Sequence, residues 1–416
     1  MKTIATALAL VLSTGVGIAA LGGIASPALA QKAAKAAEKP APPKLSKPIL
    51  AVVIAVQNLQ GAGDHAGALA SLAAAAAVPR TEKDDALIMA KLKLFSAQNL
   101  KDNAKLEEAL IEAAEAPSIT ADEKLTFSKF IAGLASNRKD YQTAWKWYEF
   151  YLAQKPDDVD MLVQAASVNA ALGSKPRVVE LLTKAIDLRE AAGQKGDRSW
   201  YEFKAQSVID SNMTDKMMPA LLSWVRAFPE PKSFNLSIEL IKQRNGNMDN
   251  NLLLDWGRLM SAAGAMTTGN NYLEYADAAI ERGMPNEADS VLKEAIAKKL
   301  IDPGKTNIGE IVRLAASKNN ETRAALPGLE KEAKTSPRIG LVVADTLANL
   351  GQYEKAVGFY KGLIGNTVVD QDTVNLRMGA ALLKMGDKPG AKAAFAAVKA
   401  GARQQIAQFY GVLAGA

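Results

Sequence analysis

Two stretches of sequence near the C-terminal end decide the fold. They are ANLGQYEKAVGFYKGLI at residues 348–364 and LLKMGDKPGAKAAFAAV at residues 382–398. Their glycines, Gly351 and Gly386, are 35 residues apart, and in both stretches alanine follows the glycine by five residues and an aromatic residue follows it by nine. Similar spacing recurs upstream around Gly283, Gly173, Lys139 and Gly63. Self-similarity with a period of about 34 residues is the signature of a repeat architecture.

Each part of the repeated pattern has a physical role in a pair of helices. The glycine permits the left-handed backbone turn that ends the first helix. Small residues on both helices let the helices approach closely, and the large residue four positions after the second-helix alanine fills the space between them. A single pair buries too little apolar surface to be stable, so the pairs must stack on one another.

This pattern resembles the tetratricopeptide repeat (TPR), most clearly at 125–192 and 269–401 and less well at 49–80. The resemblance implies an all-α protein, an α-solenoid in the form of a right-handed superhelix with about ten antiparallel helix pairs. Its concave face would bind an extended peptide or another protein. Residues 82–116, 197–264 and 304–335 are predicted to be helical, but their register is not fixed by the sequence. The segment 401–416 is predicted to be a capping helix whose polar face carries Arg403, Gln404, Gln405 and Gln408.

The N-terminal segment predicts export from the cytoplasm. Residues 1–30 combine Lys2, an apolar run and an Ala-x-Ala site before Gln31, which is typical of a cleaved signal peptide. A retained membrane anchor is the alternative, because the apolar run is nearly as long as the stretch of about 20 residues that a membrane-spanning helix needs. Residues 31–48 form an Ala-, Lys- and Pro-rich linker, either a spacer or a basic segment for peripheral envelope association. We therefore expect a periplasmic or secreted helical array over 49–416, with no transmembrane segment in the mature chain.

Composition narrows the chemistry. The chain has no cysteine and one histidine, which excludes disulfides, thiolate nucleophiles and cysteine-ligated metals. His65 follows a turn glycine by two residues, where packing is favoured over a role as catalytic base. Residues 1–48 hold six lysines and one glutamate, which leaves 44 basic and 43 acidic residues in the other 368. A nucleic-acid partner is not expected from so even a balance, and neither is a cofactor, a metal ion or a catalytic residue.

Polar clusters in the chain are interpreted first as helix caps. Asp158 follows Pro156 and precedes an apolar run, so it is predicted to cap the next helix. The loop 245–251, NGNMDNN, contains a turn signal, and Asp249 or Asn250 is predicted to cap the helix that follows it. A ligand-binding role for this loop is the alternative.

The aromatic segment WKWYEFY, residues 145–151, is the first candidate for binding a partner. Trp147 and Phe150 lie off the predicted core face, and they either pack between repeats or stand exposed as a hot spot. The inner face of the array is the second candidate, and the resemblance places Lys129, Val163, Leu273, Leu341 and Leu376 on it. Some TPR proteins clamp a terminal carboxylate with Lys, Asn and Arg, but Gly133 stands where the asparagine is required. An apolar groove is therefore preferred.

Two functions from different classes follow from these observations. The first is a non-catalytic scaffold or adaptor of the cell envelope that binds a protein or peptide in the solenoid groove. The second is a cell-wall-binding protein or a lytic enzyme built on an α-solenoid. A lytic enzyme requires an acid with a perturbed pKa in a pocket, and the only room for it is in residues 197–264.

Overall fold

The structure, a computed structural model, describes residues 42–246 and 248–415, and all regular elements within these ranges are helical. The chain divides into two compact units. The first ends at Gly196 and the second begins at Asp197. The predicted signal peptide and residues 31–41 of the predicted linker lie outside the described residues. None of the described helices combines the length and apolarity needed to cross a bilayer.

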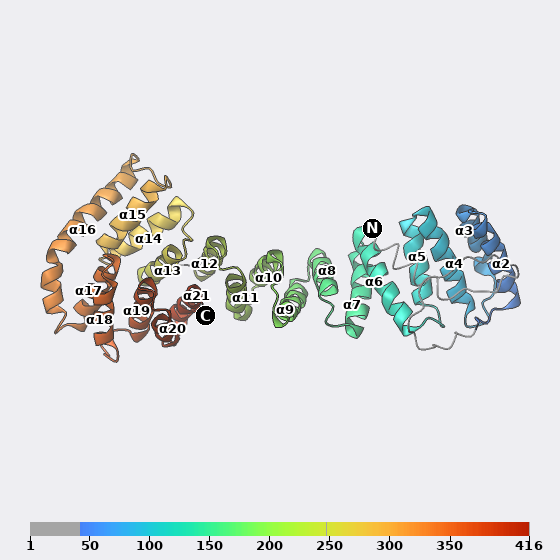
Figure 1. Cartoon of the computed structure of the whole chain (residues 1–416). Coiled ribbons are helices and arrows are strands. Elements are labelled where there is room, and N and C mark those ends of the chain that lie inside the picture. The colour runs from blue at the N-terminus through green and yellow to red at the C-terminus, as the bar shows by residue number, and fades with distance from the viewer. Residues whose placement is uncertain (1–41, 247, 416) are drawn as a thin grey trace, which may run out of the picture. The chain divides into compact units, whose positions relative to one another are not determined.

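From residue 42 onward, the described part of the first unit consists of four helix pairs, each made of two consecutive helices (Figure 1). In chain order they are α2 (Lys47–Gly61) with α3 (His65–Ala74), α4 (Asp85–Leu100) with α5 (Asn103–Ala114), α6 (Ala121–Asn137) with α7 (Tyr141–Gln154), and α8 (Val159–Ala171) with α9 (Lys175–Ala191). A short 3-10 helix, η1 (Ala75–Ala77), follows α3. Contacts between consecutive pairs make each second helix a neighbour of the next first helix, as in a solenoid.

Left-handed residues at the turns confirm the template. Gly63, Gly173, Gly283, Gly351 and Gly386 all have φ between +69° and +83°. Lys139, which stands in the place of a glycine, has φ +67° and so adopts the turn without the usual residue. Lys101 does the same at φ +58° between α4 and α5. Residues 82–116 therefore hold a pair of the same kind, with a lysine at its turn.

The folded part of the first unit begins earlier than predicted. Helix α2 starts at Lys47, and Pro48 occupies its first turn, where a missing N–H costs nothing. Before it, the backbone N–H groups of Lys44 and Ser46 donate to the carboxylates of Asp84 and Asp85 at 2.8 and 2.9 Å. The last residues of the predicted linker are thus bound to the second pair, and the expected start of the array at residue 49 is corrected to residue 44.

The second unit contains five further pairs, one long helix and a terminal helix. The pairs are α10 (Arg198–Asp210) with α11 (Thr214–Ala227), α12 (Pro231–Asn245) with α13 (Asn250–Ala262), α14 (Gly269–Glu281) with α15 (Pro285–Ala297), α17 (Pro337–Asn349) with α18 (Tyr353–Leu363), and α19 (Gln371–Lys384) with α20 (Lys388–Ala396). The 27-residue α16 (Thr306–Glu332) occupies the region 304–335, which was predicted to be helical, as one helix. The last helix is α21 (Gly401–Leu413).

Close packing within a pair depends on the small residues of the template. Gly379 on α19 lies seven residues before the turn Gly386, and a Cβ placed on it would lie 2.5 Å from the ring of Phe395 on α20. Gly257 on α13 faces the ring of Tyr275 on α14 in the same way, again at 2.5 Å. No larger side chain fits at either position without moving an aromatic ring, so both glycines are required by packing.

The terminal helix α21 does more than cover the end of the array. It packs on α19 and α20, and also on α11 and α13, which come much earlier in the chain. Phe409 is fully buried and its ring lies 6.0 Å from that of Trp256 and 6.1 Å from that of Phe234. The second unit is therefore closed on itself. Helix α21 caps the end of the array, as predicted, and it also joins α11 and α13 to the last pair.

Candidate binding sites

The two residues of the aromatic segment of α7 that were predicted as a partner site, Trp147 and Phe150, are buried or half-buried. Trp147 is only 4% exposed, and its ring makes an edge contact with that of Phe150. Phe150 is half-buried beneath the ammonium group of Lys124 on α6, 5.1 Å from its ring centroid. Burial of Trp147 contradicts the alternative of an exposed hot spot at this residue and favours packing.

The predicted inner-face residues of the first unit form ion pairs and apolar surface. The position ten residues before each turn residue is occupied by Lys91, Lys129 and Val163. Lys91 is bonded to Glu123 at 2.6 Å, and Lys129 lies 3.6 Å from Asp158, so both reach the first turn of the next first helix. Asp158 is the N-cap of α8, as predicted, and accepts from the N–H of Met161. Lys91 was missed because its turn residue, Lys101, is not a glycine and also lies 38 residues before Lys139, outside the period of about 34.

The corresponding residues of the second unit differ in exposure. Leu376 is 2% exposed and belongs to the core, so its predicted role on an open inner face is corrected. Leu273 and Leu341 are half-buried. Leu273 lies where two hollows of about 520 and 630 Å³ meet, because it and Asn270 line both. The two hollows are neighbours on either side of these residues, and we call them together the Leu273 groove.

The Leu273 groove includes the polar loop that the sequence singled out. Asp249 caps α13 through the N–H groups of Asn251 and Leu252, as predicted. Its neighbours Met248 and Asn250 line the groove together with Leu253. The loop thus combines a helix-capping role with a place on the surface of a hollow, which keeps its ligand-binding alternative as a proposal.

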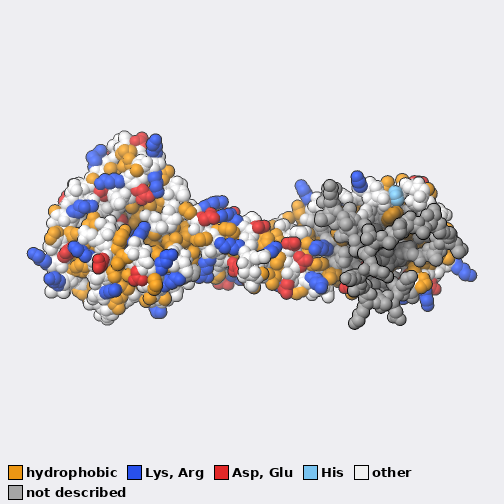
Figure 2. Space-filling view, viewed as in Figure 1, with side chains coloured by type: hydrophobic (Ala, Val, Ile, Leu, Met, Phe, Trp, Pro, Cys, Tyr) orange, Lys and Arg blue, Asp and Glu red, His pale blue; other side chains and the backbone are white. Residues whose placement is uncertain are grey.

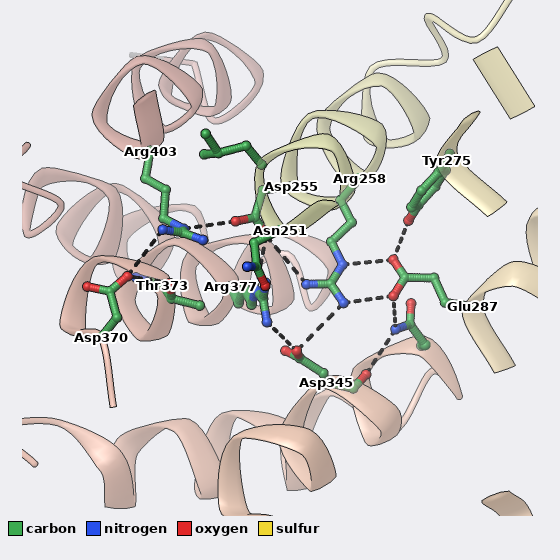
Figure 3. A network of polar contacts seen from close by, with 12 residues as sticks. Asn251, Asp255, Arg258, Tyr275, Glu287, Asp345, Asp370, Thr373, Arg377 and Arg403 are labelled. Carbon is green, nitrogen blue, oxygen red and sulfur yellow. Dashed lines mark hydrogen bonds and ion pairs between the residues drawn. The ribbon is translucent and has the colours of Figure 1, made fainter. Parts of the chain in front are cut away.

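A buried ionic network lies deeper in the second unit, around Asp255 of α13 (Figure 3). Asp255 is 1% exposed and accepts from Arg377 Nε at 3.0 Å and from Arg403 Nε at 2.9 Å. Arg258 approaches within 3.6 Å. Burial acts to raise the pKa of Asp255, but the charges of Arg377, Arg258 and Arg403 outweigh it and lower the pKa below its ordinary value. This carboxylate is permanently ionised near neutral pH.

Two further carboxylates complete the network. Glu287 of α15 receives two parallel bonds of 2.7 Å from the guanidinium of Arg258, and Asn349 Nδ2 and the Tyr275 hydroxyl also donate to it. Asp345 of α17 accepts from Arg377 Nη1 and from the Tyr360 hydroxyl, both at 2.5 Å. Bidentate and charge-assisted bonds of this kind are the strongest in proteins.

The buried part of the network is balanced in charge and joins five helices, and the exposed Asp370 lies outside it, 3.3 Å from Arg403. Three carboxylates (Asp255, Glu287 and Asp345) face three guanidinium groups (Arg258, Arg377 and Arg403), and the six residues come from α13, α15, α17, α19 and α21. Burial acts to raise the pKa of Glu287, and Arg258 outweighs it to lower the pKa. A general acid in a lytic site requires the opposite, a raised pKa. Within 197–264, the segment considered for a lytic domain, Asp255 therefore lacks that property.

His65, the single histidine, packs against Phe95, with their ring centroids 5.5 Å apart in an edge contact.

On the face shown in Figure 2, basic and acidic side chains are interspersed over each unit. This mixture agrees with the near-neutral charge of residues 49–416. Among residues 42–246 and 248–415, no three acidic, histidine or cysteine side chains are grouped to hold a metal ion.

The period, the left-handed turn residues and the pairing of consecutive helices together define the fold. It is of the tetratricopeptide-repeat type. No protein-family model matches the chain, and no curated protein matches it. Among solved structures, it is similar to the MamA RS-1 ArsTM double mutant, with 14% identity, 49% of this chain and 100% of that chain covered, and a TM-score of 0.26.

Two other similar structures are named as tetratricopeptide repeat proteins. A tetratricopeptide repeat protein from Parabacteroides merdae ATCC 43184 has 13% identity and a TM-score of 0.28, with 65% of this chain and 100% of that chain covered. The TPR domain of P58(IPK) has 12% identity and a TM-score of 0.22, with 88% and 98% covered.

Proposed function

We propose that this chain is a non-catalytic scaffold of the cell envelope that binds a protein or peptide segment in the Leu273 groove. The observation that carries the proposal is the pair of hollows, about 520 and 630 Å³, that meet at Leu273. Together they are larger than a single side chain requires, and they adjoin at Asn270 and Leu273. An extended segment fits such a groove better than a compact small molecule.

Apolar side chains give the groove its affinity for a segment with apolar residues. Leu253, Leu273 and Ile296 are half-buried, and Leu300 is 36% exposed. A partner side chain that covers them removes apolar surface from water, at about 25 cal/mol for each Å². The groove is therefore suited to one or two aliphatic or aromatic anchors.

Charge at the groove favours a segment with basic residues beside those anchors. Four acids, Glu239, Glu274, Asp277 and Asp302, line it against three lysines, Lys242, Lys299 and Lys305. Lys242 is already bonded to Glu239 and Glu274. Burial raises the pKa of Asp277, and the charge of the neighbouring Glu281 raises it further.

The envelope location rests on the sequence. Residues 1–30 have the pattern of a secretory signal peptide, and residues 31–41 continue a basic, proline-containing segment suited to peripheral association with an anionic surface. Both lie outside the described residues. Export is tested by expressing the tagged full chain in a bacterial cell and measuring its distribution between cytoplasm and envelope, with and without residues 1–30.

Capture of a partner tests the groove. The chain is used as bait against an extract of its own cell envelope, beside Leu273→Asp and Leu314→Asp variants. Leu314 on α16 is 44% exposed and does not line the groove, so it is the matched control. We expect a captured protein to be lost with Leu273→Asp and retained with Leu314→Asp, and purified partner to bind the two variants in the same order. Equal retention by both variants contradicts the proposal.

A further inference from the structure

A second, smaller cavity lies directly on the buried ionic network. It has a volume of about 230 Å³ and is lined by Arg258, Glu287, Asp345 and Arg377 at its buried end. Ser290, Glu294 and Lys384 are exposed and form its mouth. No lining residue is shared with the Leu273 groove, so the cavity is a separate feature of the second unit.

One buried hydroxyl in this cavity has no hydrogen-bond partner. Tyr410 of α21 is 3% exposed, and its ring stacks on that of Phe395 at 5.1 Å. Tyr275 and Tyr360 also line the cavity, and their hydroxyls donate to Glu287 and Asp345. The hydroxyl of Tyr410, by contrast, makes no hydrogen bond to any residue that the structure describes. The hydroxyl of a residue that lines the cavity is therefore available to a group that enters it, and can accept or donate a hydrogen bond there.

The charged side chains of the cavity do not decide the sign of its ligand. Three basic residues, Arg258, Arg377 and Lys384, line it together with three acidic ones, Glu287, Glu294 and Asp345. Both arginines are held between carboxylates of the network. With the formal charges equal, the backbone dipoles become the deciding contribution.

Three helix C-termini converge on the cavity. The last two residues of α13, α17 and α19 line it, namely Ser261 with Ala262, Ala348 with Asn349, and Leu383 with Lys384. A helix C-terminus carries about half a negative charge, from carbonyl groups without helical partners. Tyr353, the first residue of α18, also lines the cavity and brings one positive helix N-terminus against the three negative ends. The combined field favours a cation.

We propose that this cavity binds one alkylammonium group, with the Tyr410 hydroxyl oxygen accepting a hydrogen bond from it. A volume of about 230 Å³ is below that of pockets for drug-sized ligands, about 300–1,000 Å³, so only a short chain fits. The group comes either from a lysine side chain of a bound protein or from a small free amine. The proposal does not depend on the Leu273 groove, and its test requires no protein partner.

Titration of the full chain with matched small probes tests the sign of the ligand. We would measure binding of n-butylammonium and n-butyrate by ligand-observed NMR at the same pH and ionic strength. The two probes have similar size and opposite charge. We expect n-butylammonium to bind at least about tenfold more tightly, because the carboxylate meets the three helix C-termini unfavourably. Equal binding, tighter binding of butyrate or no binding of either probe overturns the proposal.

Variants then locate the bound amine. Tyr410→Phe keeps the stacked ring and removes the hydroxyl, and it is expected to weaken n-butylammonium binding by about three- to tenfold. Tyr148→Phe makes the same change at a buried tyrosine of the first unit and is expected to have no effect. Lys384→Ala removes an exposed positive charge at the mouth of the cavity, and the variant is expected to fold because the residue is exposed. We expect it to bind n-butylammonium about two- to threefold more tightly. An unchanged affinity in both Tyr410→Phe and Lys384→Ala overturns the site.

A third probe distinguishes the two sources of the amine. Nα-acetyl-lysine methylamide carries the same ammonium group on a peptide backbone. Tighter binding of this probe than of n-butylammonium assigns the cavity to a lysine side chain of a protein, and weaker binding assigns it to a small free amine. Either result supports the ammonium site, since both require the ammonium group to enter it.

Discussion

Arg403 and Asp255 are 148 residues apart in the sequence, and their side chains form an ion pair with a distance of 2.9 Å between Nε and Oδ2. Arg377, 122 residues from Asp255, binds the other carboxylate oxygen at 3.0 Å. These two bonds tie the last helices of the chain to α13. In an open repeat array each pair contacts only its neighbours, so the pairs contribute separately to stability. The closed second unit is instead expected to unfold as one cooperative body.

Removing the charge of Asp255 is expected to destabilise the second unit strongly. Asp255→Asn leaves Arg258, Arg377 and Arg403 buried with one carboxylate fewer, and breaking a buried ionic network in this way costs about 3–5 kcal/mol. Lys105→Ala is the control, because Lys105 and Glu108 form an exposed pair whose loss is expected to leave the denaturation midpoint nearly unchanged. Urea denaturation followed by circular dichroism measures both variants. A midpoint for Asp255→Asn equal to that of the native chain contradicts a stabilising network.

The shifted pKa values in the network predict that the second unit loses folding stability at both low and high pH. The pKa values of Asp255 and Glu287 are lowered in the folded state, so the stability they provide is lost as pH falls below the ordinary values near 3.8 and 4.5. Burial raises the pKa of Tyr275, so its contribution is lost as pH rises above 10, where the unfolded chain ionises first. Thermal melting from pH 2 to 11 measures both limbs. Tyr275→Phe is expected to flatten the alkaline limb, and an unchanged limb contradicts this assignment.

The helix pairs were predictable because their signals are local. A turn residue, a small residue seven before it and a large residue nine after it all lie within one pair, so a single sequence displays them. The register could not be predicted where a pair departs from the template, as at Lys101. There a lysine adopts the left-handed turn, and the spacing to the next turn residue, Lys139, is longer than the usual period. The register of residues 304–335 could not be fixed for another reason, because α16 runs through this region as one helix and has no turn of the template.

The ionic network was not predictable because its members come from distant helices. Asp345 in LVVADTLANL and Asp255 in LLLDWG are single charges within apolar helical faces. That pattern indicates a buried charge with a partner, but it does not identify which of the 50 basic residues is the partner. The pairing is set by closure of the second unit through α21, a long-range property that the repeat period does not contain.

The turn glycines provide a direct test of the repeat. Gly351 has φ +74°, and Gly351→Ala is expected to cost about 1–2 kcal/mol from left-handed strain. Gly358, seven residues later, is exposed in the middle of α18, and no atom lies within 4 Å of a Cβ placed on it. Gly358→Ala is expected to stabilise the chain by about 0.5–1 kcal/mol. Denaturation midpoints of the two variants should shift in opposite directions, and a shift in the same direction contradicts the assignment of the turn.

Burial of Trp147 predicts that its removal affects folding and leaves recognition intact. Trp147→Ala deletes a side chain that is 4% exposed, and such a deletion costs about 3–5 kcal/mol. Phe150→Ala, at a half-buried position beneath Lys124, is expected to cost less. A protein captured through the Leu273 groove should still bind folded Trp147→Ala chain with its affinity changed less than about twofold, since Trp147 belongs to the first unit and the groove to the second. The check is a partner titration at a temperature where circular dichroism shows the variant to be fully folded. If that folded variant lost binding, Trp147 would be part of the surface that contacts the partner. The Leu273 groove would then not be the whole binding site.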